Sequence, residues 1–455
     1  CGHYLWPHFK KMHKKRKQSI MSNAVAQDLM TIADIVEATT TAPIPFHITA
    51  FDGSFTGPED APYQLFVANT DAVSYIATAP GDLGLARAYL MGDLIVEGEH
   101  PGHPYGIFDA LKEFYRCFKR PDASTTLQIM WTLRKMNALK FQEIPPMEQA
   151  PAWRKALING LASRHSKSRD KKAISYHYDV GNEFYSLFLD DSMTYTCAYY
   201  PTPESSLEEA QENKYRLIFE KLRLKEGDRL LDVGCGWGGM VRYAAKHGVK
   251  AIGVTLSEQQ YEWGQAEIKR QGLEDLAEIR FMDYRDVPET GFDAISAIGI
   301  IEHIGVNNYP DYFELLSSKL KTGGLMLNHS ITYPDNRPRH AGAFIDRYIF
   351  PDGELTGSGT LIKHMQDNGF EVLHEENLRF DYQRTLHAWC ENLKENWEEA
   401  VELAGEPTAR LFGLYMAGSE WGFAHNIVQL HQVLGVKLDE QGSRGEVPER
   451  MWWTI

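Results

Sequence analysis

The chain has 455 residues, 43% of them hydrophobic and 24% charged, which is the composition of a globular protein. The formal net charge of -15 argues against general nucleic-acid binding, and no apolar run reaches the ~18 residues of a membrane span. Five scattered cysteines suggest a reducing cytoplasm and neither a disulfide framework nor a metal site, so we expect no bound metal. The length favours two domains.

The amino-terminal part shows the pattern of a smaller α+β domain. Short β-type runs at 62–69 and 72–79 lie between turn residues. Residues 81–99 follow as a short helix running into a strand, and residues 105–140 have the apolar spacing of two helices.

A proline-containing break, FQEIPPMEQAP at 141–151, is the best candidate for a domain boundary. The first 20 residues are basic and precede a Met-Ser-Asn start, so we leave them out of the fold. The predicted division is a flexible tail or start-site extension (1–20), an amino-terminal domain (21–145), a basic linker (146–172) and a larger domain (173–455).

A basic stretch runs from Lys112 to Lys172, where 14 Lys and Arg stand against five Asp and Glu. Such a run is commonly a solvated face. It is also suited to docking on an anionic lipid surface, where each basic residue adds ~1 kcal/mol. The composition leaves both interpretations open.

From about residue 205 strands and helices alternate. The predicted strands are RLLDV (229–233), KAIGVTL (250–256), AEIRFMD (277–283), FDAISAIG (292–299) and GGLMLNHSIT (323–332). The predicted helices begin at Gly238 and cover 257–271 and 309–320. This alternation implies a mainly parallel sheet covered on both faces. We expect 370–378 to close the sheet edge and two long helices, 383–403 and 408–434, to end the chain.

The segment LLDVGCGWGG (230–239) places Gly234, Gly236 and Gly238 between a strand and a helix. Glycine permits φ > 0 and a close approach of the backbone to a ligand, and open α/β sheets bind ligands at the carboxyl ends of their strands. A dinucleotide site prefers GxGxxG, whereas this turn reads GxGxG. With Asp232 ahead of it, the turn resembles motif I of the Rossmann-like class I S-adenosylmethionine-dependent methyltransferases. The alternative is an ordinary strand–helix turn.

Two further strand ends fit that cofactor. Asp283 resembles the acid that accepts from the adenine amino group, with Tyr284 covering the ring, although Asp283 could instead cap a helix. The second strand ends without the usual acid for the ribose hydroxyls. We therefore assign cofactor contacts to the residues at its tip, where Ser257 could also cap the next helix: Thr255, Leu256, Ser257 and Gln260.

Five segments then carry a family resemblance. They are YHYDVGNEFYSLFLDDSMTYTCAYY, LLDVGCGWGG, GVTLSEQQ, IIEHIG and FIDRYIFPDGEL. Across roughly 165–435 the chain resembles the cyclopropane-fatty-acyl-phospholipid synthases and the related mycolic acid cyclopropane synthases and lipid methyltransferases. A shorter segment, PGDLGLARAYLMGDLIVEG, resembles the amino-terminal domain of the phospholipid-acting synthases. The resemblance implies an S-adenosylmethionine-dependent catalytic domain at 173–455 and a lipid-binding or assembly domain at 21–145.

The resemblance also implies a role for the ring-rich segment at 174–201. In the family it folds over the cofactor, which implies contacts from Tyr195 and from Thr196, where the family has Ser. Aromatic faces attract cations and so suit a reaction that passes through a carbocation. Alternatively, these rings simply pack a core.

The resemblance implies transfer of the methyl(ene) carbon of S-adenosylmethionine to the cis double bond of an unsaturated phospholipid acyl chain. A cyclopropane ring forms through a carbocation that bound bicarbonate deprotonates. The implied bicarbonate cradle is Cys197, Glu302, His329, the backbone of Ile331, and Tyr382. From the residues alone, Glu302 could be a cap, His329 a core histidine and Tyr382 a packing residue. We do not expect Cys197 to be a nucleophile, since no base lies near it in sequence.

Phe344, Tyr348 and Phe350 are implied to line the acyl channel, or they belong to an ordinary Pro-Gly loop. The runner-up function is C-methylation of the same alkene, giving a methyl- or methylene-branched chain. A catalytically inactive lipid- or cofactor-binding module and a small-molecule methyltransferase are disfavoured. We expect unsaturated phospholipid at an anionic membrane surface as the partner, no nucleic acid, and a cytoplasmic location peripheral to the inner face of the membrane; a homodimer is left open.

Overall fold

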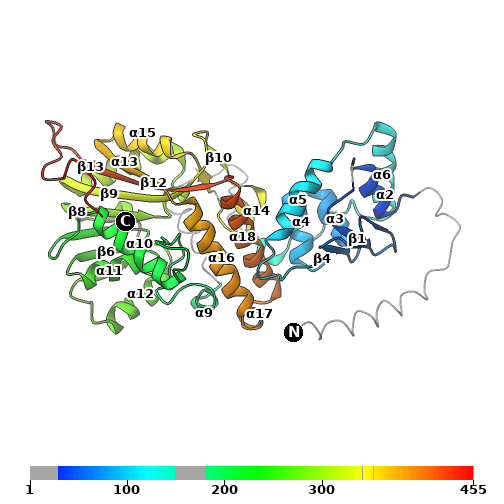
Figure 1. Ribbon diagram of the computed structural model, residues 1–455, viewed down its shortest axis with the longest axis horizontal. Coiled ribbons are helices and arrows are strands. Elements are labelled where there is room, and N and C mark those ends of the chain that lie inside the picture. The colour runs from blue at the N-terminus through cyan, green and yellow to red at the C-terminus, as the bar shows by residue number, and fades with distance from the viewer. Residues whose placement is uncertain (1–28, 42, 149–179, 341, 352, 454–455) are drawn as a thin grey trace.

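The computed structural model describes residues 29–41, 43–148, 180–340, 342–351 and 353–453, and it contains two main sheets (Figure 1). The predicted tail and most of the predicted basic linker lie outside these ranges. Among the helices in these ranges, none combines the length and the hydropathy of a membrane span.

A seven-stranded sheet forms the centre of the carboxyl-terminal part, in the order β12-β13-β9-β8-β5-β6-β7. Its strands are β5 (Arg229–Val233), β6 (Lys250–Thr255), β7 (Ala277–Phe281), β8 (Phe292–Ile298), β9 (Leu320–Thr332), β12 (Phe370–Asn377) and β13 (Gln429–Lys437). Neighbours from β9 to β7 are parallel, whereas β13 runs antiparallel to both β9 and β12. The predicted Rossmann-like, mainly parallel sheet is therefore confirmed.

The described carboxyl-terminal part also contains helices, some of which cover the two faces of this sheet. They are α9 (Asn182–Ser186), α10 (Leu207–Lys221), α11 (Gly239–Lys246), α12 (Glu258–Arg270), α13 (Tyr309–Lys319), α14 (Ala343–Tyr348), α15 (Ser358–Asp367), α16 (Arg379–Glu395), α17 (Trp397–Ala404) and α18 (Glu406–Ala424). One buried cluster joins the sheet to α10 and α11, and a separate one joins it to α13 and α15. A short hairpin, β10 (Arg339–His340) with β11 (Glu354–Leu355), flanks α14.

Hydrogen bonds and burial explain the two elements that precede the glycine turn at 234–238. Ser206 and Glu209 form a capping box that starts α10, because each side chain accepts from the other's backbone N–H. β5 is buried at four of its five positions, which explains its continuous apolar sequence. α10 and β5 thus hold the following turn from two sides.

Two predicted elements are wrong. Residues 72–79 belong to a helix, α3 (Thr70–Thr78), which Asn69 caps through the backbone N–H of Ala72. The expected helix over 408–434 ends at Ala424, and the chain then enters β13. Because β13 lies between two strands and is buried at seven of its nine positions, its apolar run has no period of two that would identify it as a strand.

The smaller sheet has the order β2-β1-β3-β4. Its strands are β1 (His47–Ala50), β2 (Phe55–Thr56), β3 (Gln64–Val67) and β4 (Leu94–Glu97). Its other helices are α2 (Ile32–Ala38), α4 (Asp82–Leu90), α5 (Gly106–Cys117) and α6 (Ala123–Lys135). The helix-to-strand prediction for 81–99 and the two helices predicted within 105–140 agree with this arrangement.

The helices α16, α17 and α18 lie between the two sheets (Figure 1). Polar contacts cross this junction. Trp421 of α18 donates its indole N–H to Asp109 of α5 at 2.9 Å. The Glu148 carboxylate joins Arg87 of α4 at 2.5 Å to Tyr348 of α14, whose hydroxyl donates to it at 2.7 Å. Hydrogen bonds and ion pairs therefore tie the part with the small sheet to the carboxyl-terminal part.

Candidate active site

A cavity of about 1210 Å³ opens at the carboxyl ends of the parallel strands. Its inner end is lined by residues at or after the ends of β5, β6, β8 and β9, including Gly234, Leu256, Gly299 and Ile331. The cavity passes α18 and continues into the interior of the small sheet, where apolar side chains such as Ile48 line it. The cavity thus joins the usual ligand edge of an open α/β sheet to an apolar space in the other sheet.

Most of the predicted site residues meet in this cavity. Those that line it are Tyr195, Thr196, Cys197, Asp232, Gly234, Gly236, Thr255, Leu256, Gln260, Asp283, Tyr284, Glu302, His329, Ile331, Phe344, Phe350 and Tyr382. Gly238, Ser257 and Tyr348 are not among the lining residues. Each of these three residues has a different structural role, described below.

The glycine turn is built from left-handed backbone, with φ of 68° at Gly234, 55° at Gly236 and 81° at Gly238. A Cβ at Gly234 would lie 1.8 Å from Ile300, and one at Gly238 would lie 2.3 Å from Ile279. A Cβ at Gly236 would meet no heavy atom within 4 Å. Gly238 therefore starts α11 against the protein interior, while Gly236 faces open space that a ligand can occupy.

The tip of β6 is a network of side chains that hydrogen-bond to one another. The Thr255 hydroxyl donates to Gln260 Oε1 at 2.8 Å and accepts from the backbone N–H of Ser257 at 3.2 Å. Ser257 caps α12, as its alternative interpretation predicted, by accepting from the backbone N–H of Gln260. Thr255 and Gln260 line the cavity from a fixed position, and Ser257 holds them there.

Asp283 lies at the end of β7 and lines the cavity, yet its carboxylate is engaged by Arg285. The guanidinium donates to its two oxygens at 2.7 and 2.6 Å, and the backbone N–H of Arg285 donates at 2.9 Å. Asp283 thus caps a short 3-10 turn, which was its alternative interpretation. Its contact with adenine stays a prediction.

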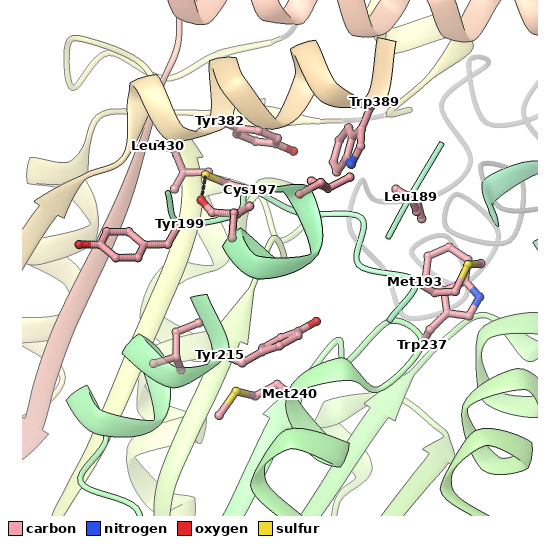
Figure 2. Packing of buried hydrophobic residues seen from close by; sticks show 14 of the residues in the cluster. Leu189, Met193, Cys197, Tyr199, Tyr215, Trp237, Met240, Tyr382, Trp389 and Leu430 are labelled. Atoms are coloured by element: carbon pink, nitrogen blue, oxygen red, sulfur yellow. Dashed lines mark hydrogen bonds between the residues drawn. The ribbon is translucent and has the colours of Figure 1, made fainter. Parts of the chain in front are cut away.

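The described part of the ring-rich segment, 180–201, packs aromatic side chains and presents Tyr195, Thr196 and Cys197 to the cavity. The Tyr195 ring lies 5.1 Å from that of Trp389, so this ring packs against the core and also lines the cavity, while its contact with the cofactor stays a prediction. Figure 2 shows Cys197 beneath Tyr382, with its thiol directed at a backbone carbonyl, that of Ala198, at 3.1 Å. Burial raises the pKa of the Cys197 thiol well above its usual value, which agrees with the expectation that it is no nucleophile.

Glu302 follows β8 and is buried with one carboxylate oxygen bound and one without a partner. The backbone N–H of Ile331 donates to Oε1 at 2.6 Å, whereas Oε2 has no hydrogen-bond partner among the described residues. Burial raises the pKa of the carboxyl to about 7, and the backbone donors lower it only in part. Among the described residues no Lys or Arg pairs with Glu302, and Glu302 caps no helix, so neither of its alternative interpretations accounts for it.

His329 lies on β9, two residues before Ile331 and therefore on the same face of the strand. Gln432 of β13 lies between His329 and Lys221: its Oε1 accepts from the Lys221 ammonium at 2.7 Å, and its Nε2 lies 3.1 Å from His329 Nδ1. Because an ammonium can only donate, the amide must donate to Nδ1, so the ring proton is on Nε2. Nε2 has no partner among the described residues.

Burial lowers the pKa of His329 well below its usual value, and Lys214 and Lys221 lower it further. The ring is therefore neutral, with Nδ1 as an acceptor and Nε2–H as a donor directed by Gln432. His329 and Glu302 together give the cavity one buried donor and one buried acceptor that no described protein group uses.

Phe344 and Phe350 line the cavity as predicted, and Tyr382 faces it with its ring 4.6 Å from that of Phe423. Tyr348 differs from its prediction because its hydroxyl points away to Glu148, at 2.7 Å, in the junction. Tyr348 is buried and links α14 to Glu148, and it does not line the cavity.

Comparison with known proteins adds the family. Residues 165–433 match the family described as mycolic acid cyclopropane synthetase. The chain belongs to this family. It is 55% identical over 426 residues, 93% of this chain and 98% of the relative, to a Mycobacterium tuberculosis protein named "Probable fatty acid methyltransferase". It is 36% identical over 285 residues, 62% of this chain and 72% of the relative, to the Escherichia coli K12 "Cyclopropane-fatty-acyl-phospholipid synthase".

A solved structure of a mycolic acid cyclopropane synthase, complexed with SAH and CTAB, aligns with a TM-score of 0.55 and 31% identity. The alignment covers 59% of this chain and 98% of that one. As a member of this family, the chain is an S-adenosylmethionine-dependent lipid methyltransferase or cyclopropane synthase. The predicted family, fold and S-adenosylmethionine cofactor are confirmed.

Two residues of this synthase-family site were missed from the sequence, Lys214 and Gln432. Lys214 is buried on α10 together with Ala210, Leu217 and Lys221. A lysine at the helical spacing of buried apolar residues was the available signal. Gln432 carried none, since its strand was read as a helix.

A group of possible metal ligands lies outside the cavity of this methyltransferase, at the junction of the two sheets. Atoms of His103, His387 and Glu420 lie within 4.8 Å of one another. His103 holds Glu391 at 2.6 Å through Nδ1 and Glu420 at 2.8 Å through Nε2, and His387 lies 3.1 Å from Glu420. These contacts account for the group as an ionic link, and the expectation of no bound metal stays a prediction.

Proposed function

We propose that this methyltransferase converts the cis double bond of an unsaturated phospholipid acyl chain to a cyclopropane ring, with bound bicarbonate as the base. The observation that carries the proposal is the continuous cavity. It runs from the glycine turn at Gly236 into an apolar space that suits a lipid chain. On the way it passes Glu302 Oε2 and His329 Nε2, which have no hydrogen-bond partner in the described part of the chain.

S-adenosylmethionine supplies an electrophilic methyl group. The alkene π electrons form a new C–C bond to that carbon as its bond to sulfur breaks, which leaves a cation on the other alkene carbon. Loss of a proton from the transferred methyl then lets the ring close. The protein must align the chain, exclude water that would trap the cation, and place a base near the new methyl group.

The described residues fit these needs. The cavity lining is mostly apolar, and the ring of Tyr382 lies within it, offering an aromatic face to positive charge. Bicarbonate has one O–H donor and several acceptor oxygens, and the site offers one acceptor, Glu302 Oε2, and one donor, His329 Nε2–H. Cys197 and Ile331 lie beside them on the cavity wall.

The exposed surface of α6, which belongs to the part with the small sheet, favours a lipid substrate held at a membrane. On α6, Leu127, Met130, Trp131 and Arg134 share one face, and Leu127 is 72% exposed. Phe141, just beyond α6, is 81% exposed. Basic residues border these apolar side chains, with Lys135 over the Trp131 ring at 5.4 Å. An exposed apolar stripe with basic neighbours is typical of a helix lying in an anionic lipid interface.

A second candidate has support of its own. The relative that is 55% identical over 93% of this chain is named a fatty acid methyltransferase. The same methyl transfer gives a methylene-branched chain when a hydride first shifts to the cationic carbon and the transferred methyl group then loses a proton to the base. A methyl branch forms only when a separate reductant later reduces that methylene group. The two functions share the cavity and the cofactor and differ in whether a hydride shifts before the proton is lost.

The products separate them. The protein is incubated with vesicles of unsaturated phospholipid and S-adenosylmethionine carrying a CD3 group, and the acyl chains are analysed by mass spectrometry before and after ozonolysis. Ring closure keeps two deuterium atoms in a chain that ozone does not cleave there. A methylene branch also keeps two but is cleaved. A methyl branch, which forms only when a reductant is added, keeps two and is not cleaved, but its chain is heavier than the cyclopropane chain by two hydrogen atoms. Unlabelled lipid would overturn both candidates, and either branched product would overturn cyclopropanation.

A further inference from the structure

Lys214 is a buried lysine on the cavity wall that the proposed chemistry leaves unused. It lies on the inner face of α10 and is 0% exposed. Its ammonium donates to the Thr196 hydroxyl at 2.8 Å and lies 4.5 Å from the centre of the Tyr215 ring. An ammonium has three N–H donors, and no second acceptor lies within hydrogen-bond distance in the described part of the chain.

The carboxylates nearest to Lys214 do not satisfy it. Asp190 accepts from the backbone and hydroxyl groups of its own turn, including the backbone N–H of Thr194 at 2.9 Å. Asp232 accepts from the Ser296 hydroxyl at 2.6 Å. Neither carboxylate forms a hydrogen bond or salt bridge with Lys214 in the described chain. Burying an ammonium group without an anionic partner costs free energy. A ligand with a negative group would therefore stabilise the charged form of Lys214.

Burial disfavours the charged forms of both Lys214 and Asp232. Burial lowers the pKa of Lys214 to about 7, and nearby Asp190, Cys197 and Asp232 raise it only in part. Burial raises the pKa of Asp232 to about 7, against the lowering by Ser296 and Lys214. Both side chains line the cavity beside the glycine turn. Each charged form would be stabilised by a ligand that brings the opposite charge.

We propose that Lys214 binds the α-carboxylate of the methionine moiety of S-adenosylmethionine, with Asp232 on the side of its α-ammonium. That carboxylate is the one anionic group of the cofactor, and its zwitterionic end matches one buried cation and one buried acid. Thr196, which holds the Lys214 ammonium, belongs to the segment that presents Tyr195 to the same cavity. The inference rests on the cofactor and is independent of what becomes of the alkene.

Two cofactor-derived ligands test this directly. S-adenosylhomocysteine carries the amino-acid end, and 5′-methylthioadenosine shares the thioether nucleoside but lacks that end. Their affinities are measured by calorimetry for the native protein and for Lys214→Met, which keeps the length of the side chain without its charge. A charge-assisted hydrogen bond to a buried carboxylate predicts a loss of about 10- to 100-fold in S-adenosylhomocysteine affinity. Affinity for 5′-methylthioadenosine should not change.

The second ligand also guards against misfolding, because a variant that binds 5′-methylthioadenosine normally has an intact nucleoside site. Lys319→Met provides a matched change, since Lys319 is a buried lysine on α13 outside the cavity lining, and it should preserve the preference for S-adenosylhomocysteine. An equal loss for both ligands, or an unchanged preference in Lys214→Met, would overturn the proposal. So would a variant whose bicarbonate requirement shifts while its ligand preference stays native.

Discussion

The two ends of the cavity are built by different means. At the sheet edge, left-handed glycines, a neutral histidine fixed by Gln432 and a half-bound carboxylate set individual atoms in place. In the small sheet, ordinary apolar side chains surround the same cavity. The inner end thus depends on single polar atoms, which are costly to bury, and the outer end on area and shape, which many side chains share. Substitutions at the inner end should change rate or affinity steeply, and those at the outer end mildly.

The steepest effect is expected at Glu302. Glu302→Gln keeps the shape of the side chain but removes the charge that would orient a base. Misplacing a general base typically costs 10²–10⁴-fold in rate, so we expect kcat to fall by about that factor. Removing dissolved carbonate should slow the native protein, and adding bicarbonate should restore it.

The control for Glu302→Gln is ligand binding, because the glycine turn is a separate element. S-adenosylhomocysteine affinity should remain native in calorimetry. Near-native turnover of the variant, or native turnover indifferent to bicarbonate, would show that the proton leaves by another route.

The next effect concerns Gly236, whose Cβ direction points into open space. In Gly236→Val the side chain would occupy the space of the cofactor, and we expect calorimetry to show S-adenosylhomocysteine affinity reduced by about 100-fold, a cost of ~3 kcal/mol. Valine at positive φ is also strained. Gly272→Val is the matched control, since Gly272 has φ of 66°, open surroundings and no place in the cavity lining. Equal losses in both variants would assign the effect to backbone strain.

The inner end was largely predictable from the sequence because it depends on residues with few alternatives. Three glycines in register after β5, and acids after β7 and β8, leave a visible pattern. Lys214 left one too, as a charge at a buried helical position. Gln432 did not, because β13 is buried on both faces and shows no period of two, and neither did the contact between His103 and Glu420, which are 317 residues apart. Such pairings depend on the docking of whole elements, which local spacing does not encode.

The junction between the two sheets should respond to pH. Burial alone would lower the pKa of His103, but hydrogen bonds to Glu420 and Glu391 raise it above 6.5. Burial alone would raise the pKa of Glu420, but its contacts with His103 and His387 lower it below 4.5. The stability from His103 is complete below pH 6.5 and is lost as pH rises through its raised value. The stability from Glu420 is present above pH 4.5 and is lost as pH falls through its lowered value.

Glu420→Gln should therefore destabilise the protein by about 1–3 kcal/mol near pH 5.5 and by less at pH 8.5, as followed by thermal unfolding. Glu406→Gln is the control on the same helix. Its exposed pair with Arg410 should contribute no more than about 0.5 kcal/mol. A loss of stability in Glu420→Gln that does not depend on pH would mean that His103 is not charged in the folded protein.

The mildest effect is expected at the outer surface of the small sheet, where apolar area rather than any single atom would hold a membrane. Replacing Leu127 and Trp131 by Ser should weaken binding to anionic vesicles by about tenfold, since each residue loses only part of the transfer energy of a buried side chain. Phe55→Ser, on β2, removes a ring that is 61% exposed and lies outside the α6 surface, and it should leave binding unchanged. Binding of the native protein should also weaken as salt rises, because screening shortens to about 8 Å at physiological ionic strength. Sedimentation with vesicles measures all of these, and salt-independent binding, or equal losses in both variants, would exclude α6 and its basic neighbours as the docking surface.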